Sequence, residues 1–106
     1  MKNPEFNAEG YPTKKTLRVI RRWPHDDFEG LMYYVLEAWQ YADLGWSRYG
    51  RRYSLSTVGW SGNEEIIVAL QKNRMFWTLC WWSARRGGHY VFRLPRIFNG
   101  RKNSGG

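Results

Sequence analysis

The sequence predicts an α+β fold, with a small, mostly antiparallel sheet and two helices packed on one of its faces. The chain has 106 residues, which is enough for one domain around one core. Runs that alternate apolar and polar side chains, typical of strands, are interspersed with runs of helical periodicity. Glycines separate the last two strand-like runs, as they do in a hairpin. The predicted element order is β-α-β-α-β-β.

The N-terminal half predicts a strand followed by a helix. TLRVIRR, residues 16–22, has the alternation of a half-buried strand. Residues 27–44 predict an amphipathic helix, with one apolar stripe that contains Phe28, Leu31, Met32, Val35, Trp39 and Ala42. Asp26 is expected to cap the first turn together with Glu29, and Gly45 to stop the helix.

A second strand and a second helix are predicted next. YGRRYSLSTV, residues 49–58, alternates as a strand does. GWSGNEEI then begins a helix, because Ser61 followed by Glu64 has the S-x-x-E spacing of a capping box. Ile66, Ile67 and Leu70 are expected to face the core, and Asn73 to close the helix.

The same helix start could instead hold a phosphate, because free backbone N–H groups and the helix dipole attract anions. Two observations weigh against this interpretation. The sequence lacks the G-x-x-x-x-G-K-[ST] and G-x-G-x-x-G patterns, and Glu64 and Glu65 place two negative charges there. We interpret GWSGNEEI mainly as a helix start, with Gly59, Trp60 and Gly62 as a secondary candidate for a pocket rim.

Two further strands are predicted at residues 75–83 and 89–94, joined by the glycines of ARRGG. Both faces of the strand at 75–83 are apolar, because successive side chains of a strand point to opposite sides. The two sets are Trp77, Leu79 and Trp81, and Phe76, Cys80 and Trp82. Since two helices cover one face of the sheet, the other needs a helical cover, a second copy of the protein or a ligand.

The charge of the chain favours an anionic partner. Its 17 basic and 9 acidic residues give a net charge of +8. Arginines that alternate with aromatic rings can neutralise phosphates while the rings stack on bases. The candidate nucleic-acid or nucleotide-binding residues are Arg51, Arg52, Trp60, Trp77, Trp81, Trp82, Arg85, Arg86, His89 and Arg93.

An alternative interpretation is purely structural. In it the rings form the core, the arginines are solvated residues that discourage sheet aggregation, and the N-terminal segment folds across the open face. We also expect a poorly ordered arm at residues 1–12, a single domain at 13–95 and a flexible basic tail at 96–106.

Little in the sequence indicates catalysis or a metal site. Cys80, the only cysteine, lies in an apolar run and is interpreted as a buried, inert thiol. Two histidines without close spacing predict no zinc site, and no cofactor is predicted. The sequence shows no signal peptide and no membrane span, so a cytoplasmic protein is expected.

The pair GWSGNEEI and FWTLCWWSARRGGHYVF resembles a group of small proteins of unassigned function encoded by tailed bacteriophages. The similar stretch covers about residues 49–94. The resemblance implies an accessory protein that works in the cytoplasm of the host bacterium, and it carries no active-site residue over to this chain. Val58 stands where a further glycine is expected in such proteins.

These observations favour a non-enzymatic protein that binds nucleic acid or a nucleotide through a basic, aromatic surface. The alternative is a module that binds a host protein, or a second copy of itself as a homodimer, through the same aromatic face. A nucleotide-processing enzyme is the least favoured class, because no base and acid stand out as partners.

Overall fold

The computed structural model describes residues 3–95. Within this range the chain forms five helices and one four-stranded antiparallel sheet, which confirms the predicted α+β class. The elements are α1 (Lys14–Arg21), α2 (Phe28–Ala38), α3 (Ala42–Gly45), β1 (Trp46–Tyr49), β2 (Arg52–Ser56), α4 (Ser61–Lys72), α5 (Arg74–Cys80), β3 (Trp81–Arg85) and β4 (His89–Arg93). The tail predicted at 96–106 lies outside the described residues.

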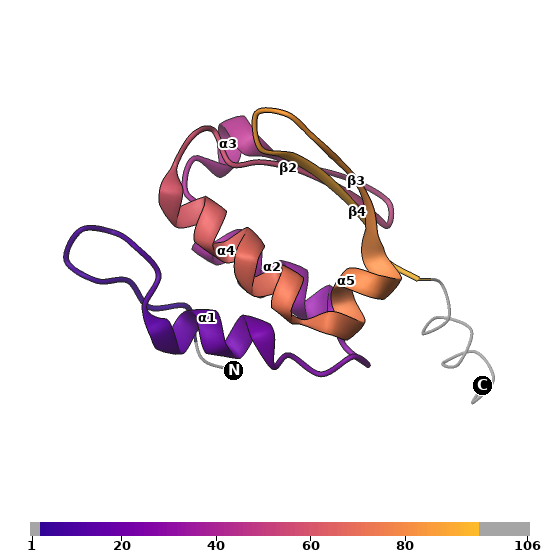
Figure 1. The fold of residues 1–106 in the computed structure, drawn as a ribbon, viewed down its shortest axis with the longest axis horizontal. Coiled ribbons are helices and arrows are strands. Elements are labelled where there is room, and N and C mark those ends of the chain that lie inside the picture. Colours follow the sequence, from indigo (N-terminus) through magenta and orange to yellow (C-terminus); the bar gives the residue numbers. More distant parts are fainter. Residues whose placement is uncertain (1–2, 96–106) are drawn as a thin grey trace.

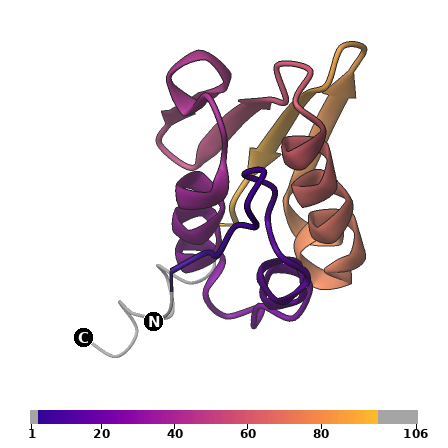
Figure 2. The same ribbon diagram turned by 90° about the vertical axis from the view of Figure 1, so that its left-hand side faces the viewer.

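The helices cover only one side of the sheet. The strand order is β1-β2-β4-β3, and each neighbouring pair is antiparallel. Figure 1 shows the sheet along the upper side of the molecule, with α2, α4 and α5 beneath it and α1 farther down. In Figure 2 α2 lies on the left and α4 on the right, with the N-terminal segment between them in this view. Of the described helices, only the short α3 is near the other side of the sheet, where Leu44 and Gly45 line its margin.

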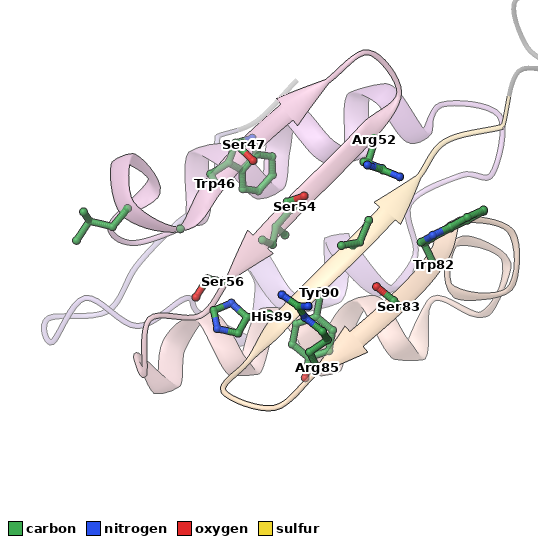
Figure 3. Close-up of a pocket in the computed structure, with 14 residues that line it drawn as sticks. Trp46, Ser47, Arg52, Ser54, Ser56, Trp82, Ser83, Arg85, His89 and Tyr90 are labelled. Carbon is green, nitrogen blue, oxygen red and sulfur yellow. The ribbon is translucent and has the colours of Figure 1, made fainter.

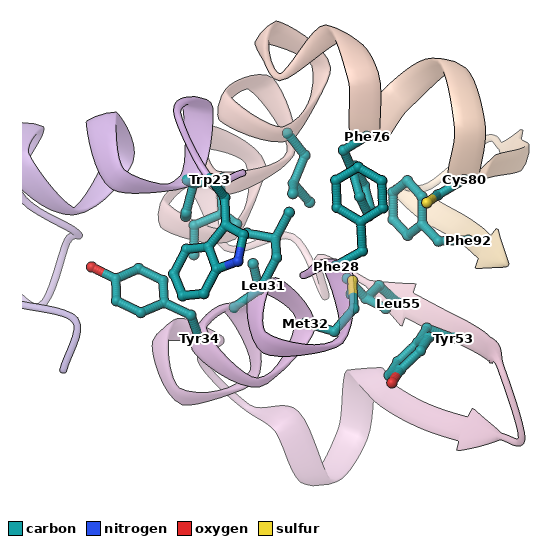
Figure 4. Packing of buried hydrophobic residues seen from close by; sticks show 14 of the residues in the cluster. Trp23, Phe28, Leu31, Met32, Tyr34, Tyr53, Leu55, Phe76, Cys80 and Phe92 are labelled. Atoms are coloured by element: carbon teal, nitrogen blue, oxygen red, sulfur yellow. The ribbon is translucent and has the colours of Figure 1, made fainter. Parts of the chain in front are cut away.

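The core lies between the helices and the covered side of the sheet (Figure 4). The strands contribute alternate side chains to it, including Tyr53 and Leu55 from β2 and Phe92 from β4. The ring of Phe76 is fully buried, 5.1 Å from that of Phe92 and 5.3 Å from that of Phe28. Burial of one such side chain contributes about 1.5–3 kcal/mol, so this aromatic group is a main source of stability.

The N-terminal segment lies against the helices. The backbone N–H of Glu5 donates to the Thr16 hydroxyl at 2.8 Å, and that hydroxyl donates to the Glu5 carbonyl at 3.0 Å. The Tyr11 hydroxyl lies 2.8 Å from that of Ser61, the first residue of α4. The alternative in which this segment folds across the uncovered side of the sheet is therefore wrong.

Residues 16–22 are not a strand, because they belong to α1 and its C-terminal cap. Thr13 caps the start of this helix by accepting a hydrogen bond from the backbone N–H of Thr16 at 3.2 Å. Thr16 and Ile20, four residues apart, are buried on the side that packs on α4. A short apolar run fits both periodicities, and here a cap outside the run favours the helix.

The helix predicted at residues 27–44 is broken into α2 and α3. Asn63 stabilises the break, since its Oδ1 accepts a hydrogen bond from the Gln40 N–H at 2.9 Å and its Nδ2 donates to the Gln40 carbonyl at 2.9 Å. The indole N–H of Trp39 donates to the Ser56 carbonyl at 3.1 Å. Bonds to distant residues thus replace the helical ones and override the local pattern.

The cap of α2 is shifted by one residue from the prediction. Asp27, not Asp26, accepts the hydrogen bond from the backbone N–H of Gly30 at 3.1 Å. Glu29 lies in the first turn, as predicted, but its carboxylate forms an ion pair with Arg48 of β1 at 3.4 Å.

The capping box predicted at α4 is absent. Trp60 is the N-cap residue and makes no side-chain cap hydrogen bond, while Ser61 is the first helical residue and Glu64 is exposed. The prediction that GWSGNEEI begins a helix is confirmed, and so are the helix end at Asn73 and its buried face.

The strand predicted at residues 49–58 is shorter, and a strand before it was not predicted. β2 covers only Arg52–Ser56, and Gly50 and Arg51 form the turn that joins it to β1. β1 begins at Trp46, directly after Gly45, the residue that was expected to stop the first helix. A Cβ atom on Gly45 would collide with the carbonyl oxygen of Ser56, so a glycine is required where the chain enters β1.

The strand predicted at residues 75–83 is also wrong over most of its length. Residues up to Cys80 form α5, and the strand β3 begins at Trp81. The Asn73 side chain caps α5 by accepting a hydrogen bond from the backbone N–H of Phe76 at 3.2 Å. Phe76 and Cys80 are buried at a helical spacing of four, which the strand preference of the surrounding aromatic residues does not overcome.

The hairpin at the C-terminal end is confirmed. β4 matches the strand predicted at residues 89–94, and it pairs antiparallel with β3. Gly87 and Gly88 have φ angles of 85° and 81°, a left-handed conformation that glycine adopts without strain.

Candidate nucleic-acid interface

The open face is the side of the sheet that points away from α2, α4 and α5. Because Tyr53, Leu55 and Phe92 point into the core, their neighbours along β2 and β4 point out of it. The side chains of the open face are Ser47, Tyr49, Arg52, Ser54, Ser56, Trp82, Ser83, Arg85, His89, Val91 and Arg93. Figure 3 looks onto this face.

Strand pairing arranges these side chains in three rows across the sheet. The first row is Tyr49, Arg52 and Arg93, with Trp82 at its end. The middle row is Ser47, Ser54, Val91 and Ser83. The third row is Ser56, His89 and Arg85. Cationic or ionisable side chains therefore lie at both ends of the face, with small side chains between them.

The dimensions of the open face follow from this register. His89 and Arg93 are four residues apart in β4, so the outer rows are separated by about 13 Å along the strand. Four strands span a width of about 14 Å. The middle of the face forms an open concavity with a volume of about 570 Å³.

Trp82 lies on the open face because of an irregularity in β3. The register between β3 and β4 shifts between Trp81 and Ser83, so the extra residue is unpaired. The indole of Trp82 is 55% exposed, and the guanidinium carbon of Arg93 lies 5.5 Å from its ring centroid. This distance allows a cation–π interaction, which places a positive charge beside an exposed aromatic ring.

The open face is also free of negative charge. The strands β1, β2, β3 and β4 contain no Asp or Glu. Arg48 pairs with Glu29 on the covered side at 3.4 Å, whereas Arg52, Arg85 and Arg93 form no ion pair within residues 3–95. An anion would thus meet three uncompensated guanidinium groups.

The structure brings together five of the ten residues that the sequence suggested for binding: Arg52, Trp82, Arg85, His89 and Arg93. Arg86 lies at their margin, exposed in the β3–β4 turn. Arg51 is elsewhere, and its guanidinium donates to the Leu94 carbonyl at 2.8 Å, which gives it a structural role.

The other three tryptophans do not reach the open face. Trp77 is half-buried in α5 and stacks on Trp81 at 6.2 Å, on the covered side of β3. Trp60 packs on Tyr11 at 4.9 Å and lines a separate concavity of about 350 Å³ together with Gly59. The two faces predicted for residues 75–83 do not exist, because most of that segment is helical.

The sequence interpretation overlooked the small polar side chains. The alternation of Ser54 and Ser56 with Tyr53 and Leu55 in β2 was visible in the sequence, and it indicates a polar outer face. The position of Ser47 on the open face could not be predicted, because its strand was not predicted. Ser83 follows the bulge at Trp82. Strict alternation along the strand would put Ser83 on the covered side with Trp81, whereas it lies on the open face.

Potential reactive groups lie elsewhere. Burial raises the pKa of the Cys80 thiol to about 12, so the thiolate is disfavoured at neutral pH. In the described part of the chain, no group of three or more His, Cys, Asp or Glu side chains is placed to hold a metal ion. No helix between residues 3 and 95 is long and apolar enough to cross a membrane.

The fold and the open face thus define a small α+β protein with a one-sided sheet whose exposed surface is basic and polar. No protein-family model matches the sequence, and no curated protein or solved structure matches it. The resemblance to phage proteins therefore stays a prediction.

Proposed function

We propose that the protein binds single-stranded nucleic acid on the open face, without catalysing a reaction. The observation that supports this most directly is the arrangement of the three rows. Guanidinium groups at both ends suit phosphates, Trp82 suits a stacked base, and no carboxylate of the strands opposes them.

The spacing of the rows favours an oligonucleotide over a mononucleotide. A separation of about 13 Å corresponds to about four nucleotides at the 3.4 Å rise of one stacked strand. A single nucleotide would reach one cationic row only, whereas a short strand can contact both. Phosphates are then neutralised at both ends of the face.

The width of the face favours a single strand over a duplex. The major groove of B-DNA is about 12 Å wide and admits a helix or a two-stranded ribbon. A four-stranded face of about 14 Å does not fit into it. Stacking on Trp82 also needs an unpaired base, which a single strand provides. Serine hydroxyls both donate and accept hydrogen bonds, so the middle row tolerates different bases.

The experiment is a fluorescence-anisotropy titration with a labelled single strand of about 12 nucleotides at low and moderate salt. We expect binding that weakens as salt rises, because phosphate contacts release counterions. The triple variant Arg52→Gln/Arg85→Gln/Arg93→Gln should bind the strand at least about tenfold more weakly. An absence of binding at low salt, or an unchanged affinity of this variant, would contradict the proposal.

A second candidate function is a protein-interaction module, including self-association. It is favoured by a separate apolar group on α5 and β3, where Met75 and Leu79 are each 48% exposed and Trp81 is 44% exposed. Sedimentation equilibrium tests self-association. A wild-type dimer that Leu79→Glu turns into a monomer would support this candidate, and a monomer at every concentration would contradict a homodimer.

A further inference from the structure

The helix α1 carries a second cationic surface, on the far side of the molecule from the open face. Its exposed basic residues are Lys14, Lys15, Arg18, Arg21 and Arg22. At 100° per residue they fall within an arc of about 120°. The opposite arc holds Thr16 and Ile20, which are buried. In Figure 1 α1 lies below the helical layer, while the sheet lies above it.

The surface extends from α1 onto the junction of α4 and α5. Asn73, between these helices, donates hydrogen bonds to the carbonyls of Ile20 at 3.0 Å and Trp23 at 3.2 Å. Its neighbours Lys72 and Arg74 are exposed, so they lie close to the C-terminal end of α1. We call Arg18, Arg21, Arg22, Lys72 and Arg74 the α1 patch.

Local structural roles account for only part of this charge. Cations near a helix C-terminus interact favourably with the helix dipole, which suits Arg18 and Arg21 in the last turn of α1. Lys15 pairs with Glu5 at 4.0 Å, but no side chain of the α1 patch forms an ion pair within the described residues. Arg18 lies three or four residues from four other cations of α1, and like charges at those spacings repel one another.

We propose that the α1 patch binds the phosphate backbone of double-stranded nucleic acid without reading its sequence. Five cations occupy the eight-residue helix and its cap, and the helix is about 12 Å long. A duplex presents one negative charge per 1.7 Å, or about seven over that length. A single strand presents only about four charges over the same length, fewer than the five cations of α1 and its cap. Only a duplex therefore offers a phosphate to each cation, and a bound duplex relieves their mutual repulsion.

An anionic membrane is the less favoured partner. Helices that lie on membranes insert an apolar face between the lipids. The apolar side of α1 is not available for this, because it packs on the rest of the protein. Thr16 and Ile20 are buried, and Leu17 and Val19 pack against the core. The patch therefore offers charge without a group to insert.

The inference does not depend on the function proposed for the open face, because it concerns other residues on the opposite side of the molecule. If both proposals hold, the protein contacts a single strand and a duplex at the same time. Such a protein would be suited to junctions between paired and unpaired segments.

The test compares two variants that each lose three arginines. Arg18→Gln/Arg21→Gln/Arg22→Gln alters the α1 patch, and Arg52→Gln/Arg85→Gln/Arg93→Gln alters the open face. Anisotropy is measured with a duplex of about 20 base pairs and with the single strand of about 12 nucleotides. The α1 variant should lose at least about tenfold in duplex affinity, with a salt slope lower by about 1 for each lost contact. It should retain its affinity for the single strand.

The sheet variant serves as the control for a general loss of charge, and it should keep its duplex affinity. Equal losses for both variants on the duplex, or no loss for the α1 variant, would overturn the inference. So would wild-type binding to phosphatidylserine vesicles without binding to the duplex. If wild type binds the duplex but no single strand, only the open-face proposal fails. Should the α1 variant not fold, Lys72→Gln/Arg74→Gln tests the same patch outside α1.

Discussion

The side chain of Asn73 is hydrogen-bonded to the backbone of Ile20, 53 residues earlier in the chain, with a distance of 3.0 Å from Nδ2 to the carbonyl oxygen. The same amide group donates to the Trp23 carbonyl at 3.2 Å, and its oxygen accepts from the Phe76 N–H at 3.2 Å. One buried residue thus ends α4 through its backbone N–H, and its side chain begins α5 and fixes this junction to the end of α1.

The first prediction is that Asn73→Ala lowers the free energy of unfolding by about 2–4 kcal/mol, because it removes three buried hydrogen bonds and leaves the Phe76 N–H without its cap acceptor. Urea unfolding followed by circular dichroism measures this change. Asn73→Asp keeps the cap oxygen but loses the two donors, and it should be at least as destabilised. Near wild-type stability of Asn73→Asp would contradict a role for the bonds to Ile20 and Trp23.

Asn73 also shows why the sequence predicted some elements and not others. The stretch after it is rich in aromatic residues, which favour strands when only local preference is considered. This stretch forms the helix α5 because Asn73 caps it and because Phe76 and Cys80 are buried at helical spacing. The same holds for α1, where Thr13 lies just outside the run that was interpreted as a strand.

A sheet with helices on one side and an open opposite face was predicted, although from two helices and from an apolar strand at 75–83 that is mostly helical. The composition of the open face depends on register. Arg52, His89 and Arg93 alternate with core residues of their strands, and this parity is visible in the sequence. Trp82 reaches the face through a bulge, and Ser47 through β1, most of which lies in residues left unassigned between the predicted helix at 27–44 and the predicted strand at 49–58. Neither event has a local signal in the sequence.

The second prediction concerns Val58, which has a φ angle of 47°. With Gly59, at φ 76°, it forms a turn closed by a hydrogen bond from Trp60 N–H to the Thr57 carbonyl at 2.9 Å. This conformation is unfavourable for a β-branched residue, whereas Asn and Gly adopt it readily.

Val58→Asn should therefore raise the free energy of unfolding by about 1 kcal/mol, measured as a shift of the urea midpoint. Gly59→Ala is the matched control and should lower it, because it introduces a Cβ atom at a positive φ. A loss of stability in Val58→Asn would mean that the apolar contacts of the valine outweigh its backbone strain.

The third prediction separates two neighbouring tryptophans of β3. Trp82→Ala should weaken binding of the single strand by about 5- to 150-fold, the equivalent of 1–3 kcal/mol for one stacked base. Trp81→Ala, on the other side of the sheet, should bind the strand as wild type does. Both tryptophans are exposed. Anisotropy titrations therefore compare the single-strand affinities of two variants that each lose one exposed indole. Equal affinities of the two variants would exclude stacking on Trp82.

The fourth prediction is that Arg18→Gln makes the free protein more stable while it weakens duplex binding. Arg18 is three or four residues from Lys14, Lys15, Arg21 and Arg22, and each like-charge pair costs about 0.2–0.5 kcal/mol. Removing Arg18 also loses its favourable interaction with the helix dipole, about 0.3–1 kcal/mol. The free energy of unfolding should therefore rise by about 0.5 kcal/mol at low salt, less at high salt. A destabilised variant would show that Arg18 has a structural role that its exposure conceals.

The fifth prediction concerns alkaline pH. Burial raises the pKa of Cys80 to about 12, and it also raises the pKa values of Tyr34 and Tyr53, chiefly by desolvation. The unfolded chain releases its thiol proton near pH 8.5, whereas the folded chain retains it. Between the unfolded and the folded pKa of such a group, the folded state binds more protons than the unfolded state. The free energy of unfolding therefore falls as pH rises, by up to about 1.4 kcal/mol per pH unit for each group.

Urea unfolding at about pH 8 and about pH 10 measures this loss of stability, since one of these values lies below and the other above the pKa of the unfolded thiol. Cys80→Ala is less stable at both values because it loses packed atoms, but its stability should fall less steeply with pH. Since the thiol contributes nothing below pH 8, the two proteins should have parallel pH profiles there and diverge above it. Parallel profiles throughout would mean that Cys80 ionises as readily in the folded chain as in the unfolded one.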